Sequence, residues 1–72
     1  MQTIKVATIF EKGKIRPVWF LYEGRKYIVK DINYEWTKKN GQSKVYHFAV
    51  SDGTNSFELR FDDREMTWKI QE

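Results

Sequence analysis

The sequence predicts an all-β protein, a small antiparallel meander of five to six strands curled into an SH3-like or OB-like barrel. Val, Ile, Thr, Tyr, Phe and Trp supply 28 of the 72 residues, whereas Ala and Leu together supply four, a balance that favours strands over helices. Five Phe, four Tyr and three Trp can each bury about 150 to 250 Å². Large rings are therefore the means by which so short a chain closes a core.

Five turn signals divide the chain. They are Glu11-Lys12-Gly13-Lys14, Glu23-Gly24-Arg25, Lys39-Asn40-Gly41-Gln42, Ser51-Asp52-Gly53-Thr54 and Asp62-Asp63-Arg64. Asn40-Gly41 and Asp52-Gly53 are the strongest, because Asn, Asp and Gly readily adopt the positive φ that a type I′ hairpin turn needs at both central positions. Links this short join antiparallel strands. The predicted strands are residues 2–10, 14–22, 25–36, 43–50, 55–61 and 65–71.

Alternation along the strands predicts which side chains face the core. One apolar side is formed by Tyr46, Phe48 and Val50 with Phe57, Leu59 and Phe61, and Val18, Phe20, Tyr22, Tyr27 and Val29 can face the same core. The opposite side of the hairpin is mainly polar and carries Val45, His47, Ala49, Glu58 and Arg60. Pro17 cannot donate a ladder hydrogen bond and is expected at an edge or a bulge of its strand.

The C-terminal segment allows two interpretations. Met66, Trp68 and Ile70 alternate with polar residues, which predicts a closing strand. A helix competes, because Phe57, Phe61, Arg64 and Trp68 also recur at spacings of three to four, with Asp62 as a possible cap. The strand is favoured.

The length of 72 residues predicts a single domain, residues 1–72. The absence of cysteine excludes disulfides, thiolate metal sites and a thiol nucleophile, and favours a reducing compartment. The longest apolar run, Val18 to Tyr22, is far shorter than the roughly 20 residues that span a bilayer, and no leader precedes it. We expect a cytoplasmic protein that does not bind a membrane.

No motif predicts catalysis. The one histidine, His47, lies within a strand and is expected to be half-exposed, without an evident nucleophile and orienting carboxylate. Asp62, Asp63 and Glu65 fit a solvated turn better than a cation site. The four glycines are scattered singly, so no phosphate-binding loop is present. We expect a non-enzymatic protein without metal or cofactor.

The charge distribution is uneven. Residues 1–44 hold ten Lys or Arg against four acids, a net charge of +6, and residues 45–72 hold three bases against six acids, a net charge of −3. If the two parts cover different sides, the molecule is polarised. A basic face attracts phosphate backbones.

Aromatic and basic residues occur together in two places. Tyr34 and Trp36 lead into Lys38, Lys39 and Lys44, a combination that grips single-stranded nucleic acid, with each base–ring stack worth about 1 to 3 kcal/mol. The alternative is that Trp36 closes one end of the barrel and the lysines keep a hairpin tip soluble. Near the other place, Trp19 beside Arg16 fits a groove for an extended, proline-rich peptide. The candidate binding residues are Arg16, Trp19, Arg25, Lys26, Tyr34, Trp36, Lys38, Lys39 and Lys44.

A string of residues between 14 and 71 carries a family resemblance. It comprises Arg16-Pro17-Val18-Trp19-Phe20, Gly24-Arg25-Lys26-Tyr27-Ile28-Val29, Ile32, Trp36, Tyr46, Phe57-Glu58-Leu59-Arg60-Phe61-Asp62 and Trp68. This resembles a family of short bacterial all-β domains of unknown function, some of which accompany Y-family lesion-bypass DNA polymerases. The resemblance implies a bacterial cytosolic protein and a connection to DNA repair, and it assigns no catalytic or binding residue.

Two functions from different classes follow. The first is a non-enzymatic small β-barrel that binds nucleic acid, preferably single-stranded, through the candidate residues. The second is a protein-interaction module that holds a partner peptide in an aromatic groove or at an exposed strand edge.

Overall fold

A computed structural model of residues 1–72 shows an all-β chain in which every strand pairing is antiparallel. This confirms the predicted fold class, but the expected five to six strands are seven. The strands are β1 (Gln2–Glu11), β2 (Lys14–Tyr22), β3 (Arg25–Ile28), β4 (Asp31–Asn40), β5 (Ser43–Ser51), β6 (Ser56–Asp62) and β7 (Thr67–Gln71).

The additional strand arises because the predicted segment 25–36 divides at Val29 and Lys30. The Val29 amide donates to the Val18 carbonyl of β2, and the Lys30 amide donates to the Ser51 carbonyl of β5, both at 2.9 Å. Consecutive amides therefore bond to different halves of the sheet. β3 continues beside β2, and β4 begins beside β5.

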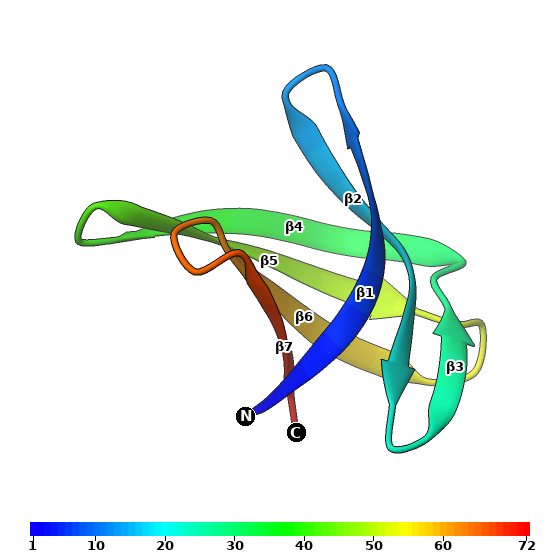
Figure 1. The fold of residues 1–72 in the computed structure, drawn as a ribbon. Coiled ribbons are helices and arrows are strands. Elements are labelled where there is room, and N and C mark those ends of the chain that lie inside the picture. The colour runs from blue at the N-terminus through cyan, green and yellow to red at the C-terminus, as the bar shows by residue number, and fades with distance from the viewer.

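The strands form one curled sheet in the order β3-β2-β1-β7-β6-β5-β4. Its two meanders are joined through β1, whose residues 2–4 pair with β7 and whose residues 5–11 pair with β2. Figure 1 shows β1 passing from one layer to the other and the β1–β2 hairpin projecting from the body. Because β3 and β4 do not pair with each other, the sheet is a half-barrel with two free edges.

The core fills the inner side of this curl. Its buried members are Ile4, Phe20, Phe48, Val50, Leu59, Phe61, Trp68 and Ile70. The predicted inner face of the β5–β6 hairpin is thereby confirmed, with Tyr46 and Phe57 half-buried against the cluster. The ring of Phe57 packs 5.1 Å from Phe20 and 4.9 Å from Tyr27, centroid to centroid.

Two β-bulges change which residues face the core. On β1 and β2, Ala7 pairs with Trp19 and Thr8 with Pro17, so Val18 is an extra residue without a cross-strand partner. The expectation that Val18 alternates with Phe20 on the inner side is therefore wrong, because a bulge interrupts the period of two. Pro17 lies at this bulge, as its missing amide hydrogen predicts. A second bulge leaves Asn33 of β4 unpaired.

The hairpin turns have a different geometry from the one expected. Positive φ at both central residues occurs at Lys12–Gly13 and Glu23–Gly24, whereas at Asn40–Gly41 and Asp52–Gly53 only the glycine has positive φ. The type I′ prediction is wrong at those two sites. In the β4–β5 hairpin, strand pairing continues through Asn40, so Gly41 becomes the first central residue of the turn, where a type II′ turn needs its positive φ.

The turn between β2 and β3 gives a stability prediction. Gly24 has a φ of +77°, a region that costs a residue with a Cβ about 1 to 2 kcal/mol. Gly24→Ala should lower the free energy of unfolding by about that amount, although no atom lies close enough to clash. Glu23→Asn in the same turn is the control, because asparagine tolerates the positive φ that Glu23 adopts. Urea unfolding measures both, and equal stability of Gly24→Ala and the parent would contradict the prediction.

The β6–β7 connection contains the only trace of the competing helix. The Met66 amide donates to the Asp62 carbonyl at 2.8 Å, and Asp62 Oδ1 accepts from the amides of Arg64 and Glu65 at 2.9 and 3.1 Å. This single turn ends at Met66, whose φ is +57°. The closing strand consequently begins at Thr67, two residues later than predicted, and Met66 is exposed. The structure contains no helix long and apolar enough to cross a bilayer.

Candidate functional site

The outer face of β4 and β5 carries three rings in contact, which we call the outer aromatic row: Tyr34, Trp36 and His47. Trp36 lies directly opposite His47, and their rings stack with centroids 4.9 Å apart and planes 8° apart. Tyr34 lies against Trp36 at 5.1 Å. Because Trp36 shares the face of His47 and is not part of the core, the alternative that it closes one end of the barrel is wrong.

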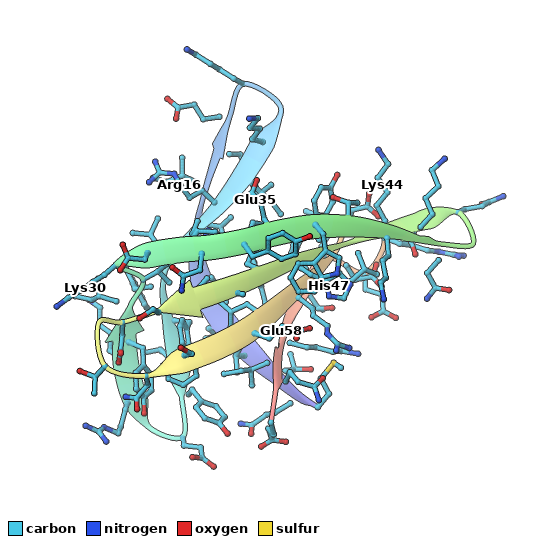
Figure 2. All side chains as sticks on the ribbon, turned by 180° about the vertical axis from the view of Figure 1, so that it is seen from behind. Arg16, Lys30, Glu35, Lys44, His47 and Glu58 are labelled. Carbon is cyan, nitrogen blue, oxygen red and sulfur yellow. The ribbon has the colours of Figure 1, made fainter.

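His47 is buried rather than half-exposed as expected, with 7% of its surface accessible. Trp36 covers the imidazole ring of His47. The Nδ1 atom of His47 lies 3.4 Å from Glu58 Oε2. Arg60 Nε donates to the same carboxylate oxygen at 2.9 Å. Figure 2 shows His47 and Glu58 on the same side of the sheet. Trp36 and Glu58 therefore hold His47 from the two neighbouring strands, and Arg60 holds Glu58 along β6.

Glu58 receives opposing effects on its acidity. Partial burial alone would raise its pKa, but hydrogen bonds from Arg60 and His47 and the Arg60 charge outweigh burial, so the pKa of Glu58 lies below its ordinary value of 4.5. The pKa of Asp52 is also lowered, from 3.8, because the amides of Asn55 and Thr54 donate to its carboxylate.

These directions predict acid sensitivity. A carboxyl group whose pKa is lower in the folded chain stabilises the fold above its unfolded pKa, and this stabilisation is lost as the pH falls through the folded value. The parent should therefore lose stability below about pH 4.5. Glu58→Gln should lose less between about pH 7 and about pH 3, as measured by urea unfolding. If Glu58→Gln loses as much stability as the parent between these two pH values, Glu58 is not held by Arg60 and His47 in solution.

Two hollows lie beside the outer aromatic row and share Val45 and Arg60. The first, of about 330 Å³, is lined by Lys38, Lys39, Asn40, Val45, His47 and Arg60. The second, of about 140 Å³, is lined by Met1, Val45, Arg60, Asp62, Thr67 and Lys69. The hydroxyl oxygen of Thr67 is buried there without a hydrogen-bond partner. Lysine and arginine side chains therefore border these hollows near the stacked rings, together with one carboxylate, Asp62.

The nine predicted binding residues separate into two groups. Arg16, Trp19 and Lys26 lie on the outer face of β2 and β3, and Arg25 has its guanidinium carbon 5.8 Å from the Tyr27 ring. Tyr34, Trp36 and Lys38 lie on the outer face of β4, at the opposite end of the strand order. Lys39 and Lys44 pair near the end of the β4–β5 hairpin. Figure 2 places Arg16 at the projecting β1–β2 arm and Lys44 toward the far end of β5.

The basic part of the sequence is also divided between the two ends of the strand order. Most of the basic part, residues 1–44, folds into β1–β3 at one end of the strand order and β4 at the other, while β5–β7 lie between them. The strand order therefore places the acidic part between two basic segments.

Three residues beside Tyr34 and Trp36 are missing from the predicted binding residues: His47, Arg60 and Lys69. For His47 and Arg60 the sequence does hold a signal, because the alternation predicts both on the polar face of their hairpin. The structure pairs His47 with Arg60 and Arg60 with Lys69, so the three form a line across β5, β6 and β7. Only the pairing of β6 with β7 brings Lys69 to the site.

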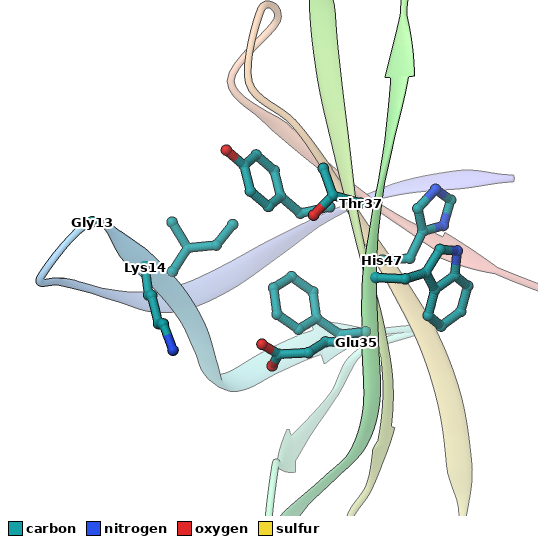
Figure 3. A pocket seen from close by; sticks show the side chains of 9 residues that line it. Gly13, Lys14, Glu35, Thr37 and His47 are labelled. Carbon is teal, nitrogen blue, oxygen red and sulfur yellow. The ribbon is translucent and has the colours of Figure 1, made fainter.

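A third hollow, of about 200 Å³, opens on the inner side between the β1–β2 arm and β4–β5 (Figure 3). Its lining includes Lys14 and Ile15 on the arm and Glu35, Thr37 and Tyr46 on the opposite strands. Figure 3 shows Glu35 directed toward the arm and His47 on the other side of β4. Trp36 and His47 also line this hollow, but one lysine and one glutamate do not form a cationic surface for phosphates.

The carboxylates of the β6–β7 turn act as hydrogen-bond acceptors. Asp62 accepts from amides of its own turn, and Asp63 Oδ1 accepts from the Lys44 amide at 2.9 Å. No group of three or more His, Asp or Glu side chains is arranged to hold a metal ion.

No protein-family model, curated protein or solved structure matches the chain.

Proposed function

We propose that this protein is a non-enzymatic module that binds single-stranded nucleic acid on the outer face of β4, β5, β6 and β7. The observation that carries the proposal is the outer aromatic row with its bordering cationic hollows. Rings that receive bases, next to cations that receive phosphates, are the two parts that sequence-tolerant binding of single strands requires.

Tyr34 is the ring that receives a base. It is 64% exposed, and it rests against Trp36, which is in turn stacked on the buried His47. Support by two further rings holds Tyr34 in place before binding, which reduces the ordering cost that a mobile side chain would add. Stacking of one base contributes about 1 to 3 kcal/mol.

The phosphates are neutralised by Lys38 and Lys69 on the outer face and by Lys39, whose pairing with Lys44 places it on the other side of β4 but at the edge of the same hollow. None of the three forms an ion pair within the chain, whereas Arg60 is partly neutralised by Glu58. Phosphate contacts are independent of base identity and weaken with salt.

The proposal includes the family resemblance and an SH3-like or OB-like type of barrel. A strand shared between two curled layers supports an SH3-like or OB-like barrel, and OB-type barrels commonly bind oligonucleotides. A cytoplasmic protein linked to bacterial DNA repair fits single-strand binding.

Tryptophan fluorescence tests the location of the site. Titrating an oligothymidylate at low salt should quench the parent, because bases stack near Trp36. The quenching should persist in Trp19→Phe and be lost in Trp36→Phe, which keeps a ring on β4, while Trp68 is buried in both. Thermal unfolding shows whether each variant is folded. Quenching that disappears in Trp19→Phe instead would move the site to β2 and β3 and overturn the proposal.

A further inference from the structure

The outer face of β1, β2 and β3 carries a second surface, built from three strand-to-strand rows. One row is Ala7, Trp19 and Ile28, and it lies between Lys5, Leu21 and Lys26 on one side and Ile9 and Arg16 on the other. We call the apolar members the β1–β3 patch: Ala7, Ile9, Trp19, Leu21 and Ile28. Three of them are large and exposed, Ile9 at 39%, Leu21 at 40% and Ile28 at 54%.

The charged border of this patch is basic. Lys5, Arg16 and Lys26 alternate with the apolar side chains, and the Lys26 ammonium lies over the Trp19 ring, 4.5 Å from its centroid. The only acid that the pairing places on this face is Glu11, which lies at the end of the arm opposite Lys14. A partner that buries the patch therefore meets positive charge around it.

The patch adjoins a free strand edge. β3 pairs with β2 alone, so one side of its backbone is available to an added strand. A segment lying beside β3 brings alternate side chains next to Lys26 and Ile28. Main-chain hydrogen bonds supply affinity in this mode of recognition, and the neighbouring side chains supply specificity.

We propose that the outer face of β1–β3 binds an extended protein segment in which acidic side chains alternate with aliphatic or aromatic ones, added as a strand at β3. Charge complementarity to Lys5, Arg16 and Lys26 identifies the acidic part, and the exposed Leu21 and Ile28 identify the apolar part. A nucleic acid fits less well, because aliphatic side chains offer no stacking surface and Lys26 covers the one ring. This surface is distinct from the outer aromatic row.

Selection from phage-displayed random dodecapeptides tests this inference, with the intact protein as the immobilised target. The enriched peptides should carry Asp or Glu next to Leu, Ile, Val or Phe. As labelled synthetic peptides, they should bind Ile28→Glu and Lys26→Glu at least about tenfold more weakly than the parent in fluorescence anisotropy, a loss typical of a central contact. Tyr34→Ala should bind them as the parent does.

A charge exchange guards against variants that merely fail to fold. Lys26→Glu should recover affinity for a peptide in which one acid is replaced by lysine. The inference is overturned if no peptide is enriched, if the enriched peptides are basic, or if Ile28→Glu and Lys26→Glu leave their affinity unchanged. Loss of oligonucleotide binding in these two variants, with peptide binding retained, would also overturn it. If the nucleic-acid proposal alone fails, Tyr34→Ala will bind the oligonucleotide as the parent does, while the peptide results stand.

Discussion

Replacing Phe61 with alanine is expected to lower the free energy of unfolding by about 3 to 5 kcal/mol, the usual cost of truncating a buried ring. Phe61 is 5% exposed, and its ring contacts Trp68 at 5.1 Å and Tyr46 and Phe10 at 6.3 Å. Small domains hold only about 5 to 15 kcal/mol in total. The variant should therefore unfold at a much lower urea concentration, or fail to fold at room temperature.

Tyr34→Ala is the control for that measurement, because it removes a ring of similar size from a position that is 64% exposed. It should change the free energy of unfolding far less. Phe57→Ala should lie between the two, since Phe57 is only half-buried although it packs on Phe20 and Tyr27. A Phe61→Ala variant as stable as Tyr34→Ala would contradict the assignment of the inner face.

The second large effect is expected in binding. Reversing Lys38 and Lys39 to Glu should weaken the affinity for single strands of every sequence, because phosphate contacts carry no base information. The slope of log affinity against log salt should flatten by up to about 1.4, at about 0.7 for each of two lost contacts. Fluorescence anisotropy of a labelled oligonucleotide between about 50 and 200 mM salt measures both quantities.

A matched control separates position from net charge. Lys12→Glu with Lys14→Glu gives the same net charge, but on the β1–β2 arm, which faces the inner side of β4 and not the side that carries His47. This double variant should keep the parent slope. If both double variants weaken binding equally, binding responds to total charge and the surface of β4–β7 has no special role.

Much of the fold could be predicted because local pattern determined it. The β5–β6 hairpin alternates strictly, and its inner residues Phe48, Leu59 and Phe61 lie in the core as expected. The break at Val29 and Lys30 could not be predicted, because neither residue disfavours a strand. It depends on hydrogen bonds to Val18 and Ser51, which are remote in sequence.

The sequence predicts several of the residues that form the site, but it does not predict which of the candidate residues lie together. Tyr34 and Trp36 are two residues apart and share a face in any strand, and Trp36 meets His47 once the β4–β5 hairpin forms. The separation of Arg16 and Trp19 from this group follows from the β1–β7 pairing, between the two ends of the chain. Residue order alone carries no signal for that contact.

The central claim is that Tyr34 and its cationic neighbours bind a single strand, and the affinity of Tyr34→Ala tests it most directly. An oligothymidylate should bind the parent at about 50 mM salt, with log affinity falling linearly as log salt rises. Tyr34→Ala should bind about 5- to 150-fold more weakly, the equivalent of one lost stack of about 1 to 3 kcal/mol, with an unchanged salt slope. Absence of binding by the folded parent at that salt, or equal affinity of Tyr34→Ala and the parent, would contradict the claim.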